Sequence, residues 1–312
     1  YLLRFFLKNI FLEVYSKKRK KMKIDPSKDM CACTICDDDY VSGLIILIES
    51  ILEFNNWFNL KFYVFMDSDK KINLENQKLL LNIYPNFKFL DLKDEFFEIK
   101  YKNQQNIRFS RFSQTYLGLY AFNMIDYKTI LSLDTDILCQ GNFKHLLSNK
   151  NNADIIAVSD AQRSQRSQLF FKSQNQNKEF KSIQSNEKIF QINTGVYVIN
   201  EKLISKKVYN NLFQLAKEGI TNGQELGGDQ EVINCYLEKN SNIILSYAPF
   251  IYNSSARVFM GINFNRIKSI NPIFIHYVGN KPWSKKIFLI GKLRKIRKLW
   301  IEYTRKIINE RY

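Results

Sequence analysis

The sequence has 312 residues, of which 45% are hydrophobic, and it carries a formal net charge of +17. A chain of this size can bury one large core or two closely joined ones, and its recurring apolar runs exclude a wholly disordered protein. The five cysteines lack the spacing of a metal-binding module, so we expect reduced thiols, as in a cytosolic protein.

Residues 1–28 form a basic segment in which apolar residues recur at helical spacing. Arg4 and Lys8 interrupt the apolar residues too early for a membrane-spanning helix, and no small-residue cleavage site follows, as a signal peptide requires. The first residue is Tyr1 rather than Met, which leaves room for an upstream segment or anchor.

The apolar run 31–36 predicts a buried strand that ends in Asp37, Asp38 and Asp39, and a helical pattern follows over 41–54. This order is typical of the first strand, loop and helix of a nucleotide-binding domain, where acidic side chains accept hydrogen bonds from a ribose or a base. No G-x-G-x-x-G motif is present, so a dinucleotide-binding fold is not indicated.

Strand and helix patterns continue to alternate along the chain, which predicts an α/β fold. We expect strands at 60–66, 87–92, 129–133 and 155–159, and helices at 73–84 and 112–124. The polar stretch 162–187, rich in Ser, Gln, Asn and Lys, predicts a mobile loop.

Asp134 and Asp136, separated by Thr135, stand directly after the apolar run 129–133. Carboxylates are costly to desolvate, so two of them beside a buried strand indicate that a cation or strong hydrogen bonds compensate their charge. Oxygen ligands of this kind suit Mg²⁺ or Mn²⁺. A solvated turn after a strand is the alternative interpretation.

Short polar side chains stand at two later element ends. Asn-Thr-Gly at 193–195 precedes the apolar run 196–199, and Gly-Gly-Asp-Gln at 227–230 precedes a helical pattern. Binding sites tend to be built at such ends. The structural alternatives are a turn residue at Asn193 and a helix N-cap at Asp229.

A short apolar run, 271–275, predicts a strand that leads His276 into a loop containing Gly279, Lys281 and Trp283. His276 is one of only two histidines, and a neutral imidazole at a strand end is suited to complete the ligand set of the two aspartates. Lys281 supplies a cation for a phosphate, and Gly279 allows close backbone approach. A surface histidine in a turn is the alternative.

Taken in chain order, these motifs resemble the motif series of glycosyltransferase family 8, which includes bacterial lipopolysaccharide galactosyl- and glucosyltransferases and the glycogenins. The matching segments are 37–40, 133–136, 193–196, 229–231 and 276–283. The resemblance implies a Rossmann-like GT-A fold with a mixed central sheet over residues 29–284. It further implies a nucleotide-sugar half, 29–160, and an acceptor half, 161–284, with the polar loop over the site or toward the acceptor.

The resemblance implies a retaining, metal-dependent hexosyltransferase that moves glucose or galactose from a UDP-sugar to a lipopolysaccharide or lipooligosaccharide acceptor. It implies that Mn²⁺, or Mg²⁺, is held by Asp134, Asp136 and His276. The implied donor contacts are Asp37, Asp38, Asp39 and Tyr40 around the nucleoside, Thr135 in the metal motif, Gly279 and Lys281 at the diphosphate, Asp160 and Asn193 at the sugar, and Asp229 and Gln230 near its anomeric carbon.

The chain departs from the family pattern at two positions. Where the family often has Tyr-x-Arg-Leu, this chain has Tyr-Leu-Gly-Leu at 116–119, so Gly118 replaces the donor-contacting arginine, and Arg108 or Arg111 are candidates for that role. Asp39 stands where Asn is common, which adds negative charge near the nucleotide. Because Gln230 is not a carboxylate, we favour front-side displacement over a covalent intermediate on Asp229.

The last segment, 285–312, has apolar residues at helical spacing and cations on the remaining faces. The apolar residues are Leu289, Leu293, Ile296, Trp300, Tyr303 and Ile307, and the cations are Lys292, Arg294, Lys295, Arg297, Lys298, Arg305 and Lys306. Such a basic amphipathic helix can lie in the surface of an anionic membrane, and docking of its stripe on the protein's own core is the alternative. We expect a cytoplasmic enzyme, peripheral on the inner face of the cell membrane, with a lipid-linked acceptor.

Three competing classes are weaker. A basic nucleic-acid-binding protein accounts for the charge, but no recognised module is present and the charge concentrates at the termini. A phosphatase of the haloacid dehalogenase type also carries Asp-x-Asp, but Leu138 stands where Thr or Val is usual, and the histidine-lysine loop has no role in it. An inactive glycosyltransferase relative is compatible with Gly118.

Overall fold

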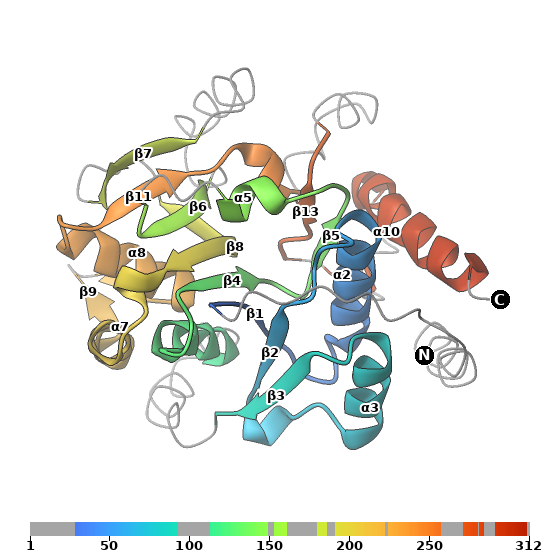
Figure 1. Cartoon of the computed structure of the whole chain (residues 1–312), viewed down its shortest axis with the longest axis horizontal. Coiled ribbons are helices and arrows are strands. Elements are labelled where there is room, and N and C mark those ends of the chain that lie inside the picture. The colour runs from blue at the N-terminus through green and yellow to red at the C-terminus, as the bar shows by residue number, and fades with distance from the viewer. Residues whose placement is uncertain are drawn as a thin grey trace.

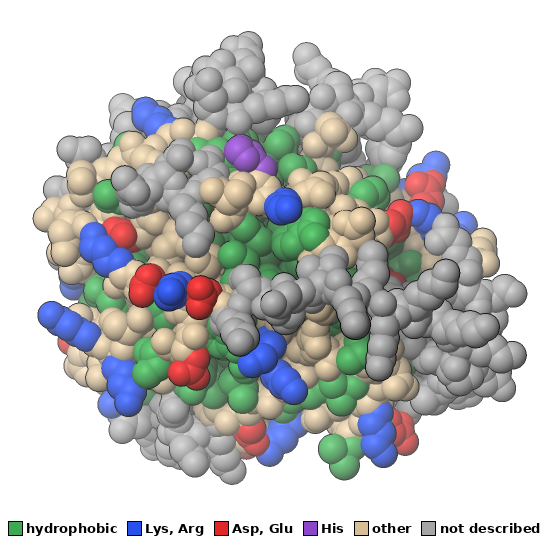
Figure 2. All heavy atoms as spheres, in the orientation of Figure 1, with side chains coloured by type: hydrophobic (Ala, Val, Ile, Leu, Met, Phe, Trp, Pro, Cys, Tyr) green, Lys and Arg blue, Asp and Glu red, His purple; other side chains and the backbone are tan. Residues whose placement is uncertain are grey.

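An eight-stranded mixed sheet forms the centre of the molecule, in the order β3-β2-β1-β4-β8-β6-β11-β7 (Figure 1). The computed structural model describes residues 29–92, 113–148, 153–160, 180–185, 191–221, 224–256, 271–279, 281–283 and 291–310. The predicted N-terminal segment, 1–28, lies outside these residues. On the face shown in Figure 2, lysines and arginines lie among acidic side chains and do not form one continuous basic patch.

The strands of the main sheet are β1 (Met30–Ile35), β2 (Lys61–Met66), β3 (Phe87–Asp91), β4 (Thr129–Leu133), β6 (Ile155–Ser159), β7 (Lys181–Gln184), β8 (Ile192–Asn200) and β11 (Ile244–Tyr247). The first four are parallel, β8 runs antiparallel to both β4 and β6, and β7 runs antiparallel to β11. The prediction of a Rossmann-like α/β fold with a mixed central sheet is confirmed.

Two smaller sheets flank the main one. The first has the order β12 (Ser254–Ser255), β13 (Phe274–His276) and β5 (Ile137–Cys139), and the second pairs β9 (Ile220–Thr221) with β10 (Gln224–Glu225). β5 follows β4 after three residues, so the chain leaves the main sheet at the Asp-Thr-Asp motif.

Helices cover both faces of the main sheet (Figure 1). They are α2 (Val41–Phe54), α3 (Leu74–Ile83), α5 (Lys144–Ser148), α7 (Lys206–Glu218), α8 (Asp229–Lys239) and α10 (Gly291–Glu310), with 3₁₀ turns η1 (Ser68–Lys70), η2 (Ser113–Asn123), η5 (Glu201–Leu203) and η6 (Phe250–Tyr252). One core contains α2, and the other contains residues of η2, α7 and α8. The near-continuous apolar sequences of β1 and β4 follow from this burial on both faces.

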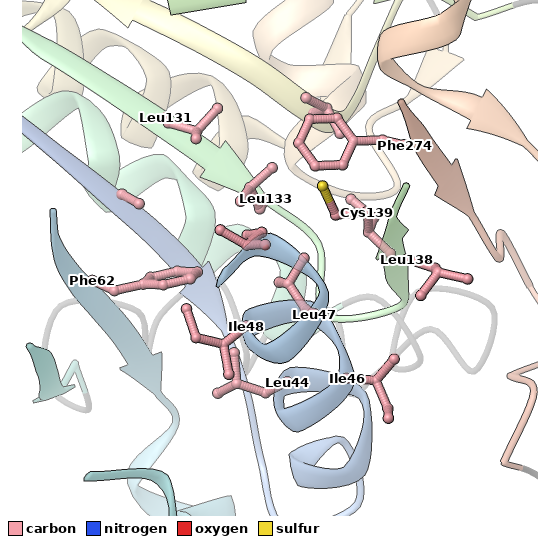
Figure 3. Packing of buried hydrophobic residues seen from close by; sticks show 14 of the residues in the cluster. Leu44, Ile46, Leu47, Ile48, Phe62, Leu131, Leu133, Leu138, Cys139 and Phe274 are labelled. Atoms are coloured by element: carbon pink, nitrogen blue, oxygen red, sulfur yellow. The ribbon is translucent and has the colours of Figure 1, made fainter. Parts of the chain in front are cut away.

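The core around α2 holds the turn with the three aspartates at 37–39 in place, because α2 begins shortly after it, at Val41. Figure 3 shows side chains of this helix packed against the main sheet and against β5 and β13. The labelled residues are Leu44, Ile46, Leu47, Ile48, Phe62, Leu131, Leu133, Leu138, Cys139 and Phe274. A well-packed core of this kind holds β5 and β13 against the main sheet.

The structure corrects three predicted elements. Part of the stretch 162–187 forms β7, because residues 181–184 find an open edge on β11, while most of that stretch lies outside the described residues. Residues 113–123 form a 3₁₀ helix. Asn193 lies inside β8 and does not precede it, because Ile192 already pairs with Ser159 of β6.

α10 is observed at the C-terminal end of the chain, and the described part of its apolar stripe lies on the protein's own core. Trp300, Tyr303 and Ile307 are all less than 9% exposed and belong to the core cluster of α2. These three residues therefore do not face a membrane, contrary to the membrane interpretation, because packing on α2 already buries them. None of the helices in the described part of the chain combines the length and apolar character that a membrane crossing requires.

We expect Asn55→Ala to lower the free energy of unfolding by about 2–3 kcal/mol, the cost of leaving buried backbone groups unpaired. Asn55 is fully buried, accepts a hydrogen bond from the Phe143 amide at 3.0 Å and donates one to the Gly141 carbonyl at 3.1 Å. Urea unfolding measures the change. Asn211→Ala, at an exposed position of α7, is the control, and an equal loss in both variants would contradict this role of Asn55.

Candidate functional site

Asp134, Asp136 and His276 meet where β4 and β13 end and β5 begins. β5 and β13 pair antiparallel with Ile137 opposite His276, which brings the imidazole to the Asp-Thr-Asp motif. The His276 Nε2 atom lies 3.2 Å from a carboxylate oxygen of Asp134 and 3.2 Å from one of Asp136. One ligand atom from each of the three residues lies within 4.8 Å of the others. The three residues that the sequence predicts as metal ligands are therefore together.

Hydrogen bonds behind His276 fix the tautomer of its ring. The Gly195 amide donates to Asn193 Oδ1 at 3.0 Å, so that oxygen is an acceptor and the Asn253 Nδ2 group donates to it at 2.7 Å. Asn253 Oδ1 then lies 3.0 Å from His276 Nδ1 and accepts a hydrogen bond from the Nδ1–H group. The neutral ring consequently presents an Nε2 lone pair to two carboxylates, an arrangement that is stable only with a proton or a cation between them. The residues present therefore fit a divalent metal.

Charges in the site compensate one another. Burial opposes protonation of His276, but Asp136 and Asp134 raise the pKa of His276 to about 9. Burial alone would raise the pKa of Asp136, yet the neighbouring His276 and Lys281 cations hold it well below its usual value. Burial similarly opposes the charge on Lys281, and its contact with Asp136 raises the Lys281 pKa. With no metal bound, the two aspartates favour the charged imidazolium form of His276 at neutral pH.

Gly195 makes room for this imidazole. A Cβ atom at position 195 would lie 2.2 Å from His276 Cε1, a distance that no real side chain tolerates. The Gly195 carbonyl also accepts a hydrogen bond from the Asp134 amide at 2.8 Å. Sequence reasoning missed Asn253 and assigned Asn193 to the donor sugar, because the contact between them joins segments 60 residues apart. Within this network the sequence pointed only to Asn193 and Gly195, as an asparagine and a glycine beside an apolar run.

A second polar cluster joins β6, β8 and α8. Gln230 donates from Nε2 to Asp160 at 2.9 Å, and its Oε1 accepts from the Thr194 amide at 3.3 Å. Asn234 holds the same region, because its side chain bonds both the amide and the carbonyl of Ile192. Asp160 and Gln230, predicted from separate motifs, are thus in direct contact.

Asp229 begins α8, and its backbone amide donates to Thr115 Oγ1 at 3.3 Å. Burial, followed by repulsion from Asp134, raises the pKa of Asp229 to about 7. A Cβ atom at Gly118 would lie 3.2 Å from Asp229 Oδ2, so the position where the family often has arginine borders this carboxylate. Arg108 and Arg111, the predicted replacements, lie outside the described residues.

Two of the three aspartates at 37–39 accept hydrogen bonds from other groups of the protein. Asp37 Oδ1 accepts from the Asp39 and Tyr40 amides at the turn before α2. Asp38 accepts from Asn73 and Asn76 at the start of α3, so it also anchors that helix. Asp39 is exposed. Asp37 and Asp38 thus have structural partners that the sequence did not reveal.

The loop after β13 carries Lys281, whose ammonium group contacts Asp136. Gly279 has φ of +90°, a conformation that favours glycine. Lys281 Nζ contacts Asp136 and lies 5.5 Å from the centre of the Tyr40 ring, and Tyr40 packs edge-on against Trp283 at 5.7 Å. Lys281 and Tyr40 therefore stand at the metal ligands.

Comparison with known proteins identifies relatives of this chain. A model of glycosyl transferase family 8 matches residues 31–286. The lipopolysaccharide 1,2-glucosyltransferase of Escherichia coli is 25% identical over 284 residues, covering 88% of this chain and 78% of that protein.

Two solved glycosyltransferases have a similar fold. The galactosyltransferase LgtC, in complex with donor and acceptor sugar analogues, has a TM-score of 0.58 at 18% identity, covering 86% of this chain and 95% of LgtC. GlyE of Streptococcus pneumoniae TIGR4 has a TM-score of 0.56 at 20% identity, covering 90% of this chain and 63% of GlyE. At these identities the likeness shows the fold alone. Because the family match covers most of the sequence, from β1 to the end of the His276 loop, this chain belongs to glycosyltransferase family 8.

Proposed function

We propose that this family 8 glycosyltransferase is metal-dependent and retaining, and that it transfers glucose or galactose from a UDP-sugar to a lipopolysaccharide or lipooligosaccharide acceptor. The observation that carries the proposal is the placement of Asp134, Asp136 and His276 around one point, with Asn253 fixing the imidazole. The Escherichia coli relative, a lipopolysaccharide glucosyltransferase by name, supports the acceptor class. Both hexoses remain in the proposal, because donor choice depends on a few hydrogen bonds to one hydroxyl.

In this proposal the metal ligands, the lysine loop and the aspartate turn bind the donor together. Bound Mn²⁺ or Mg²⁺ would neutralise the diphosphate and stabilise the negative charge that develops on the departing UDP. Lys281, with Gly279 beside it, would leave Asp136 and place its ammonium on the diphosphate. The turn at 37–40 would contact the nucleoside, with Asp39 as its exposed carboxylate.

The residues beside the donor sugar support front-side displacement. Gln230 has both ends of its amide engaged by Asp160 and Thr194, so it positions groups and offers no carboxylate. A pKa of about 7 leaves Asp229 partly protonated at neutral pH, which weakens it as a nucleophile. A donor phosphate oxygen would then accept the proton of the incoming hydroxyl, while the protein orients the two substrates.

A peripheral position on the inner face of the cell membrane is part of the proposal. Lys298, Arg305 and Lys306 of α10 are exposed, with Lys298 paired to Glu302 and Lys306 to Glu53, while Trp300 and Tyr303 are buried against the core. Cations in this arrangement attract an anionic lipid surface electrostatically without inserting the helix. The same proposal places the nucleotide sugar on residues 29–160 and the lipid-linked acceptor on residues 161–284.

A catalytically inactive relative is the second candidate, and one observation favours it. Gly118 borders Asp229 at the position where the family often has an arginine, so no side chain at this position neutralises the carboxylate. Such a protein would bind the donor and transfer nothing, which separates it from the first candidate.

Calorimetric titration tests the nucleotide and metal site. We expect UDP to bind in the presence of Mn²⁺ and the Asp136→Asn variant to weaken that binding at least about 100-fold, because a metal ligand and the partner of Lys281 are lost together. Asp126→Asn, at an exposed carboxylate, is the matched control and should bind like the wild type. Absence of UDP binding by the wild type with Mn²⁺ would refute the proposal.

Metal binding should release about one proton near pH 8, because the metal must displace the Nε2 proton of a His276 whose pKa is about 9. Titration of Mn²⁺ into the UDP-saturated protein in buffers of different ionisation enthalpy measures this number. The stabilisation from charged His276 in the metal-free protein is fully present below its ordinary pKa of 6.5 and is lost as the pH rises through about 9.

The other histidine provides the control for this measurement. His145 is exposed on α5, so the His145→Gln variant should release the same number of protons on metal binding as the wild type. His276→Gln should bind the metal weakly and release no proton. Wild-type binding without proton release would show that His276 is not a ligand.

Mass spectrometry of the enzyme after incubation with a 2-fluoro donor sugar and Mn²⁺ tests the displacement mechanism. We expect no covalent sugar on Asp229, because the intermediate is not formed in a front-side reaction. A trapped glycosyl group on Asp229 would replace this mechanism with double displacement.

A further inference from the structure

Aromatic contacts connect α10 to the segment that carries His276 and Lys281. The Trp300 ring centre lies 5.2 Å from that of Tyr277, edge-on, and 5.2 Å from that of Trp283. Trp300 and Tyr277 are each only 3% exposed. Tyr277 directly follows His276, and Trp283 lies two residues after Lys281, so α10 packs against the chain on both sides of Gly279.

Trp283 carries this packing to the metal motif. A Cβ atom at Gly43 of α2 would lie 2.6 Å from Trp283 Cη2 and also 2.6 Å from the Thr135 carbonyl oxygen. The indole and the backbone of the Asp-Thr-Asp motif thus share one slot that only glycine leaves open. On its other side the Trp283 ring meets Tyr40, over which Lys281 lies.

A carboxylate of α2 holds α10 in place. The Tyr303 hydroxyl donates to Glu53 Oε2 at 2.5 Å, and the Lys306 ammonium pairs with the other oxygen of the same carboxylate. Ile307 is 6% exposed in the core beside them. Because α2 is buried along most of its length, these contacts fix α10 to a rigid element.

β13 is a short strand, so the segment that carries His276 and Lys281 depends on side-chain packing as well as on backbone pairing. β13 has three residues and lies between β12, which has two, and β5, which has three. Short strands open more easily than long core strands. Trp283 packs against Tyr40 and Gly43 at the start of α2, and Trp300 of α10 packs against both Tyr277 and Trp283.

We propose that α10 positions the metal and nucleotide site, with Trp300 as the positioning residue that holds Tyr277 and Trp283 and thereby keeps His276 and Lys281 at Asp136. The inference rests on the proposed UDP and metal site for its functional consequence. Trp300 touches no predicted ligand atom and acts only through its two aromatic neighbours.

The experiment compares Trp300→Ala, Trp300→Phe and Phe87→Ala in the full chain. Phe87 is a buried aromatic of β3 that packs against Phe62, Tyr84 and Phe89, so its truncation matches the loss of a core aromatic far from the loop. We expect Trp300→Ala to raise the Kd of UDP with Mn²⁺ about tenfold and Trp300→Phe to recover most of the affinity. Phe87→Ala should lower the Tm similarly and leave the Kd unchanged.

Hydrogen exchange of the ligand-free proteins separates this inference from the proposed function. Amides of 274–279, Lys281 and Trp283 should exchange faster in Trp300→Ala than in Phe87→Ala, whether or not UDP binds. If Trp300→Ala does not fold, Tyr303→Phe loosens the contact with Glu53 and should produce the same change at smaller size. Equal exchange and equal Kd in the Trp300 and Phe87 variants would overturn the role of Trp300.

Discussion

The charge balance around Asp136 is the constraint on which the rest of the site depends. This carboxylate is 2% exposed, and a buried charge without compensation would destabilise the fold. His276 and Lys281 supply that compensation from β13 and the loop after it, which the pairing of β13 with β5 brings to Asp136. The two cations beside Asp136 compensate its buried charge in the absence of a metal.

The remaining polar residues have separate roles around this charge balance. Asn193, Asn253 and Gly195 serve the imidazole, since they fix its tautomer and leave space for its ring. Gln230 of α8 is joined by hydrogen bonds to Asp160, which follows β6, and to Thr194 of β8. β8 therefore contributes to both polar clusters, with Thr194 in this one and Asn193 and Gly195 in the one behind His276.

The C-terminal helix α10 carries part of the positive charge of the chain on a helix that is packed on the core. Its apolar residues stabilise the protein's own core, so the exposed cations of α10 are carried on a docked helix. A docked helix presents its charges in a fixed arrangement, which favours electrostatic contact with a surface over insertion into it. The helix therefore combines a structural role at the ligand loop with a charged outer side.

The sequence by itself predicted the alternation of strands and helices and brought forward Asp134, Asp136 and His276 as candidate metal ligands, because apolar periodicity and polar residues at strand ends are local signals. It also led to the family through five motifs in one order. Only the tertiary structure decided that Asn253 orients His276, that Asp38 anchors α3, and that Trp300 faces the protein and not a lipid. These depend on contacts between distant segments, and an amphipathic stripe has the same sequence whether its partner is a core or a membrane.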